Sequence, residues 1–157
     1  YPERLVAMAP VDEWRLRDEP DKVIEEVVTA VTVNGLHAIK FNPLGYMVSN
    51  EEWDSGFYSS FWDAVTGLGV PIFFTLGNGP ESPSIATGIQ GERDGYINEL
   101  HILMRWMERY PDTICSLTHG FPWRTFLEED RIVLPPDVWE PFKGDNCNLE
   151  LCFPVLI

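Results

Sequence analysis

Short apolar runs recur along the chain, and segments with the spacing of amphipathic helices separate them. Each run is only a few residues long, which suits a strand that is buried on both faces. Successive runs begin 31, 34, 44 and 35 residues apart. The five expected strands are residues 5–8, 36–41, 70–74, 114–117 and 149–153.

Apolar side chains at helical spacing fill the intervals between the first four runs. Gly35 and Gly69 stand where the first two helices should end, directly before the next strand. Residues 121–144 are less regular and predict one or two short helices, interrupted by Pro135 and Pro136. The three apolar stripes are Val23, Ile24, Val27, Val28 and Val31; then Phe57, Phe61, Val65 and Leu68; then Ile97, Leu100, Met104 and Met107.

Strands that alternate with helices at this period predict parallel βαβ units. An open doubly wound sheet and a (β/α)8 TIM-type barrel both fit the pattern. About 30 residues per unit matches a barrel of about 250 residues, so a half-barrel is the more economical interpretation. The chain begins at Tyr1 and ends in the apolar run 154–157. We therefore expect residues 1–157 to be a single partial domain, about five βα units of a larger barrel.

Composition narrows the function classes. The chain has 157 residues and a formal net charge of −14, which argues against nucleic acid and anionic membranes as partners. Apolar residues make up 45% of the chain, which excludes a disordered acidic tail, and no run approaches the length of a membrane span. The three cysteines show no disulfide framework, so we expect reduced thiols and a cytoplasmic protein.

Polar residues stand where the expected strands end, which is where α/β proteins gather their chemistry. They are Asp12, Lys40, Asn42, Thr75 and His119. The glycine-rich segment 76–95 follows the third strand and has the composition of a lid or binding loop.

Two of these residues are candidates for catalysis. His119 follows the fourth strand directly, so its imidazole can serve as a metal ligand or a general acid–base group, or it can simply cap a loop. Lys40 lies within an apolar run, where a lysine is costly unless it faces a polar cavity. Lys40 can hold a substrate carboxylate or act as a base. The alternative is that Lys40 has no functional role and extends its side chain to solvent at the strand end. His37 and His101 are expected to be structural.

Four sequence blocks resemble the amidohydrolase-related family, which includes metal-dependent aromatic-acid decarboxylases. The blocks occur in the family's order and cover nearly the whole chain. They are residues 1–12 (YPERLVAMAPVD), 35–43 (GLHAIKFNP), 61–64 with 69–74 (FWDA…GVPIFF), and 110–112 with 118–120 (YPD…THG).

The resemblance implies a (β/α)8 barrel with a divalent metal at the carboxyl mouth, often zinc or manganese, and zinc is the metal that we expect. His119 matches a metal ligand of the family, whereas Thr75 replaces a histidine ligand, and threonine is a poor ligand for zinc. The substrate expected is a small carboxylated, aromatic molecule bound by Lys40, Asn42, Thr75 and Arg124, with His119 and Lys40 catalytic.

Two functions are therefore predicted. One is part of a metal-assisted hydrolase or non-oxidative decarboxylase. The alternative is a catalytically altered or inactive barrel that binds a small molecule or a protein partner. A homo-oligomer is compatible with either.

Overall fold

The computed structural model describes residues 5–43, 52–76, 88–118 and 126–149. A five-stranded parallel sheet runs through these residues in the order β1-β2-β3-β4-β7. Its strands are β1 (Met8–Pro10), β2 (Ala38–Phe41), β3 (Ile72–Phe74), β4 (Cys115–Leu117) and β7 (Cys147–Leu149).

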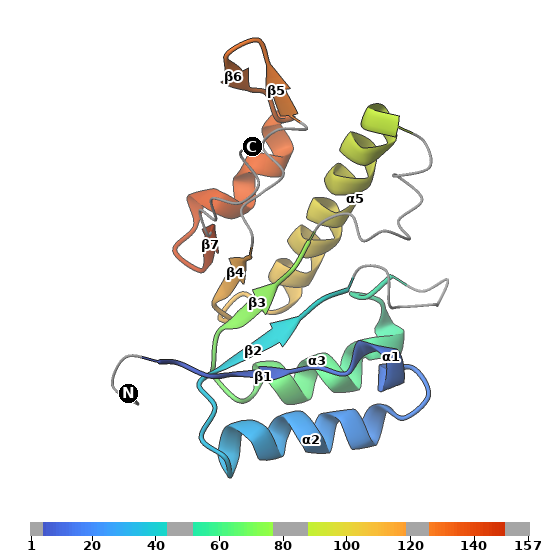
Figure 1. Ribbon diagram of the computed structural model, residues 1–157, viewed down its shortest axis with the longest axis vertical. Helices are drawn as coiled ribbons and strands as arrows, with labels where there is room; N and C mark the ends of the chain where they lie inside the picture. The colour runs from blue at the N-terminus through green and yellow to red at the C-terminus, as the bar shows by residue number, and fades with distance from the viewer. Residues whose placement is uncertain (1–4, 44–51, 77–87, 119–125, 150–157) are drawn as a thin grey trace.

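Helices connect the strands, as Figure 1 shows. The longest is α5, which lies between β3 and β4 in the sequence and runs alongside them (Figure 1). A small hairpin stands apart from the main sheet. The helical elements are α1 (Glu13–Leu16), α2 (Pro20–Thr32), η1 (Gly56–Tyr58), α3 (Ser59–Thr66), α5 (Gly88–Arg109) and η3 (Pro136–Lys143), and the hairpin joins β5 (Leu127–Glu128) to β6 (Arg131–Ile132).

The strand order separates the two architectures that the sequence left open. Each strand pairs with the next main-sheet strand along the chain, so the order never reverses. A doubly wound sheet needs a reversal to place helices on both faces, whereas a barrel winds in one direction. The described part of the chain is therefore a partial (β/α)8 TIM-type barrel.

One face of the sheet packs against the helices and forms the core. Phe41 and Phe74 point to this face, and neither is exposed. The Trp62 ring of α3 lies 4.8 Å from the Phe41 ring, and the Trp106 ring of α5 lies 5.0 Å from the Phe74 ring, centroid to centroid. The ring centroids of Trp62 and Trp106 are themselves 5.3 Å apart. This aromatic cluster fixes α3 and α5 on the same side of the sheet.

Both predicted glycines lie three residues past the end of a helix, since α2 ends at Thr32 and α3 ends at Thr66. Gly35 has a φ of +70° and Gly69 a φ of +67°, in the left-handed region that only glycine enters at low cost. Each glycine turns the chain from the end of a helix toward the next strand, which is β2 after Gly35 and β3 after Gly69.

Several predicted boundaries are wrong. The first strand begins at Met8 and not at residue 5, because pairing with β2 starts there and leaves Leu5 73% exposed. The fifth strand is Cys147–Leu149, and residues 150–153 of the prediction lie outside the described residues.

The glycine-rich segment is also shorter than predicted. Residues 88–95 belong to helix α5, so within the described residues only Leu76 remains of the predicted loop, and residues 77–87 lie outside them. The region expected to hold short helices contains η3, but also the β5–β6 hairpin, which the sequence analysis missed.

Candidate functional site

The face of the sheet opposite the helices carries Lys40 and Thr75, two of the predicted polar residues. Lys40 is in register with Phe73 of β3, which in turn is in register with Ser116 of β4. Side chains two residues apart on a strand share a face, so Thr75 and Thr118 follow on the same face at the carboxyl ends of β3 and β4. In a complete barrel this face is the interior, and this edge is its mouth.

Lys40 joins the two threonines into one cluster. Its Nζ donates hydrogen bonds to Thr75 Oγ1 and to Thr118 Oγ1, the latter over 2.7 Å. The two hydroxyl oxygens are also 2.7 Å apart. Three neighbouring strands therefore bring one ammonium and two hydroxyls to a single point. These hydrogen bonds explain why a lysine is tolerated in this apolar strand, because its ammonium finds polar partners at the ends of the neighbouring strands.

The hydroxyl protons can be assigned from the acceptors. Thr118 Oγ1 lies 3.2 Å from the carbonyl oxygen of Phe74, to which its hydroxyl donates. Thr75 then donates to Thr118. Thr118 is 5% exposed, whereas Thr75 is half-buried. Thr75 is consequently the hydroxyl that can turn its proton toward a molecule arriving from the mouth.

A carboxyl group lies at the same edge. Glu13, the first residue of α1, accepts a hydrogen bond from the backbone N–H of Asn42 over 2.6 Å. Asn42 follows the last residue of β2, so this bond ties the Glu13 carboxyl to the strand that carries Lys40. Burial raises the pKa of Glu13, and the nearby charge of Asp12 adds to that rise. The Asn42 N–H and the charge of Lys40 act in the opposite direction and do not cancel it.

The structure brings some predicted residues together and leaves others untested. Lys40 and Thr75 are in contact, and Asn42 takes part through its backbone N–H. His119 and Arg124 lie outside the described residues.

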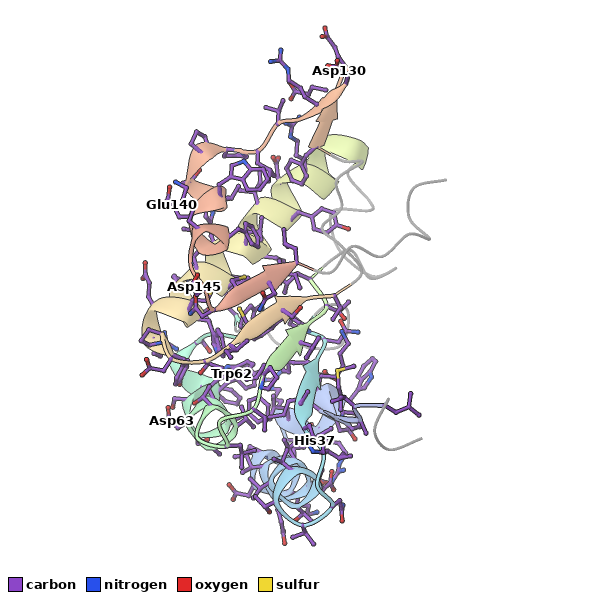
Figure 2. The ribbon with its side chains drawn as sticks, turned by 90° about the vertical axis from the view of Figure 1, so that its left-hand side faces the viewer. His37, Trp62, Asp63, Asp130, Glu140 and Asp145 are labelled. Atoms are coloured by element: carbon purple, nitrogen blue, oxygen red, sulfur yellow. The ribbon has the colours of Figure 1, made fainter. Side chains whose placement is uncertain are left out.

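The other two histidines lie away from this edge. His37 precedes β2 at its amino end (Figure 2). The ring of His101 in α5 lies 2.8 Å from the carboxylate of Asp137 in η3. Both positions agree with the structural role expected for these residues.

The sequence analysis missed two residues at this edge, Thr118 of the cluster and Glu13. Thr118 could have been found, because it follows β4 at the position that Thr75 occupies after β3. Glu13 could not have been found this way, because its place at the site depends on a hydrogen bond to a residue 29 positions away.

The described residues do not fit a divalent metal. The threonine hydroxyls accept hydrogen bonds from an ammonium, whose charge opposes a cation at the same point. Among the described residues, no group of three or more His, Cys, Asp or Glu side chains could hold a metal ion. The zinc expectation thus rests on His119 and stays a prediction.

The fold and the residues at the carboxyl edge of the sheet together define the class of protein. It is a partial TIM-type barrel with a cationic, hydroxyl-lined site at its mouth. No family model and no curated protein matches the sequence. In the described part of the chain, no helix is long and apolar enough to cross a membrane.

Solved structures share this fold. The chain is similar to 2,6-dihydroxybenzoate decarboxylase from Rhizobium, with a TM-score of 0.59, 21% identity, and coverage of 94% of this chain and 52% of the decarboxylase. The decarboxylase complexed with 2,6-dihydroxybenzoate matches with the same values. A "putative amidohydrolase" from Staphylococcus aureus has a TM-score of 0.53 and 19% identity, over 81% of this chain and 44% of that protein.

These likenesses confirm the predicted barrel-type fold. The matched proteins are of the kind that the sequence motifs resemble. The chain spans about half the length of the decarboxylase.

Proposed function

We propose that this chain belongs to an enzyme that acts on a small carboxylated, aromatic acid by hydrolysis or non-oxidative decarboxylation. Lys40, with Thr75 beside it, binds the carboxylate of that substrate. The observation that carries the proposal is the convergence of one ammonium and two hydroxyls at the carboxyl ends of three neighbouring strands. The names of the similar structures support the choice of substrate class, since one is a decarboxylase bound to an aromatic acid.

The chemistry of the cluster suits an anion. A lysine ammonium is a point charge that attracts a carboxylate, and a hydroxyl that can reorient adds a neutral hydrogen bond. The low exposure of the surroundings strengthens that attraction relative to bulk water. The chain carries 25 acidic against 11 basic residues, so a cation held inside the mouth is a distinct feature of its charge distribution.

His119 completes the proposal on sequence grounds. It follows Thr118 directly, and we assign it the movement of a proton during the reaction. His119 is also the residue that would hold the zinc implied by the family resemblance. Lys40 and Thr75 bind and orient the substrate without a metal.

The proposal is tested by binding. Isothermal titration of the complete protein with 2,6-dihydroxybenzoate should give a measurable affinity, and Lys40→Met should weaken it at least about tenfold, since a charged hydrogen bond contributes about 1.5–3 kcal/mol. Lys22→Met is the matched control, because Lys22 lies on α2, where it pairs with Glu19. Equal affinity in the wild type and Lys40→Met would contradict the proposal. Binding with no turnover of any aromatic acid would favour the inactive, ligand-binding barrel.

A further inference from the structure

We propose that Cys115 and Cys147 form a modification site, a pair of thiols that an oxidant of the peroxide class converts to a disulfide between β4 and β7. The inference is independent of the proposed function, because neither cysteine belongs to the cluster around Lys40. The disulfide would attach β7, an outer strand among the described residues, covalently to its neighbour in the sheet.

Backbone pairing places the two cysteines directly beside each other. Cys115 of β4 is in register with Cys147 of β7, and the Cys115 N–H donates to the carbonyl oxygen of Asn146 over 2.7 Å. Paired strands lie about 4.8 Å apart, within the range of about 4.4–6.8 Å that separates the Cα atoms of a disulfide. The two backbones therefore have the spacing that a disulfide needs.

The two side chains point to the same face of the sheet. Cys115 is in register with Ile72, which lies two residues before Phe74, so its side chain shares the face that packs against the helices. In-register neighbours on adjacent strands share a face, so Cys147 points there too. The two thiols are hydrogen-bonded to each other on this face. The sulfur atoms thus already lie in contact.

The thiol–thiol hydrogen bond makes the two cysteines unequal. The hydrogen bond from Cys115 lowers the pKa of Cys147, and burial opposes this change. The same hydrogen bond, and then burial, raise the pKa of Cys115. Cys147 is also the more exposed side chain, at 7% against 0% for Cys115. Because a thiolate attacks an oxidant and a thiol does not, Cys147 reacts first and Cys115 then resolves the product.

The reaction balances with hydrogen peroxide as the two-electron oxidant. The Cys147 thiolate attacks one peroxide oxygen, the O–O bond breaks, and the released hydroxide combines with the proton that Cys147 has lost. Cys115 sulfur then attacks the sulfur of the resulting sulfenic acid. The S–S bond forms, the S–O bond breaks, and the hydroxyl leaves as water with the Cys115 proton. Two thiols and one peroxide give one disulfide and two waters.

The experiment is treatment of the complete protein with hydrogen peroxide, followed by tryptic digestion without reduction and mass spectrometry. Cleavage after basic residues places Cys115 in the peptide 110–124, and Cys147 with Cys152 in the peptide that begins at residue 144. We expect these two peptides to be joined, and fragmentation of the joined species to place the bond at Cys147. Dithiothreitol should separate them again.

Cys152→Ser is the matched control. It should keep the cross-link and a rise in Tm of about 5–10 °C on oxidation, the usual effect of a disulfide. Cys147→Ser should lose both, and melting of the reduced variant checks that it folds.

Three results in the wild type would overturn the inference: a bond to Cys152, oxidation to sulfinic acid without a cross-link, or no reaction. A cross-link that leaves Tm unchanged would overturn the claim that it fixes β7. The wild-type fragmentation spectra decide between these results even where Cys147→Ser does not fold.

Discussion

The hydroxyl of Thr75 is the part of the cluster that can adapt to a ligand. Thr75→Val keeps the shape of the side chain and removes the hydroxyl, so we expect the affinity for 2,6-dihydroxybenzoate to fall by about twofold to tenfold, the value of one neutral hydrogen bond. Thr75→Ser retains the hydroxyl and should bind like the wild type. Titration calorimetry on the three proteins checks this, and equal weakening in both variants would show that shape and not the hydroxyl matters.

His119 gives the second prediction at the scale of single residues. His119→Ala in the complete protein should lower kcat by about 10²–10⁴ if the imidazole moves a proton. Turnover is normalised to the folded fraction, measured by thermal melting. A lower melting temperature with normal turnover for each folded molecule would instead assign His119 a structural role.

Single residues differ in how far the sequence reveals them. Lys40 was predicted because a lysine inside an apolar run is expensive without polar partners, and Thr75 and Thr118 supply those partners. Glu13 looked like one acidic residue among 25, and only the fold brings it to Asn42. A site residue was therefore predictable where a charged side chain interrupts an apolar run, as Lys40 does, and not where it is one of many similar residues, as Glu13 is.

Among the elements, α3 buries Phe61, Trp62 and Val65, and Trp62 is the largest of these side chains. Trp62 (Figure 2) is fully buried. Its Nε1 donates to the carbonyl oxygen of Trp53 over 2.7 Å. Trp62→Ala should lower the free energy of unfolding by about 3–5 kcal/mol, the usual cost of a large cavity. Phe57→Ala is the control, because Phe57 is 54% exposed, and it should cost about 0.5 kcal/mol or less. Chemical denaturation measures both, and similar losses would contradict the assigned core.

Helix α5 carries a carboxylate that opposes stability at neutral pH. Glu99 accepts a 2.9 Å bond from Trp53 Nε1, and burial raises its pKa, with Glu52 and Asp54 adding to the rise. A carboxyl with a higher pKa in the folded state binds more protons there, so stability falls as the pH rises through that range.

Glu99→Gln keeps the acceptor for Trp53 and removes the charge. It should raise the Tm at pH 7 by about 2–4 °C, and the gain should disappear below about pH 4, where Glu99 is protonated. Glu25→Gln, an exposed change on α2, should leave Tm unaltered. Melting curves at both pH values decide, and a lower Tm for Glu99→Gln at pH 7 would contradict this account of Glu99.

Element types were more predictable than element boundaries. The apolar residues of α2 recur at helical spacing and form one face to be buried, so their spacing predicted a helix there. Leu5 and Val6 are as apolar as a strand requires, yet pairing with β2 starts later, at Met8. Glycines at 88, 91 and 95 suggested a loop, but α5 includes them, because packing of its later turns through Leu103 and Trp106 outweighs helix propensity.

At the scale of the whole molecule, the sheet has two outer strands. Within the described residues β1 and β7 each pair on one side only, and unpaired edges promote association. The net charge of −14 opposes contact between copies, and salt screens it. We expect the polypeptide 1–157 to associate more strongly at about 0.5 M salt than at low salt. Sedimentation velocity measures this, and a monomer under both conditions would contradict it.

The central claim is that Lys40 binds the carboxylate of an aromatic acid. A crystal structure of the complete protein with 2,6-dihydroxybenzoate tests it most directly. The account predicts a carboxylate oxygen about 2.7–2.9 Å from Lys40 Nζ, with Thr75 Oγ1 donating to the same group. An aromatic acid bound elsewhere, with Lys40 still held by Thr75 and Thr118 and out of contact with the ligand, would contradict it.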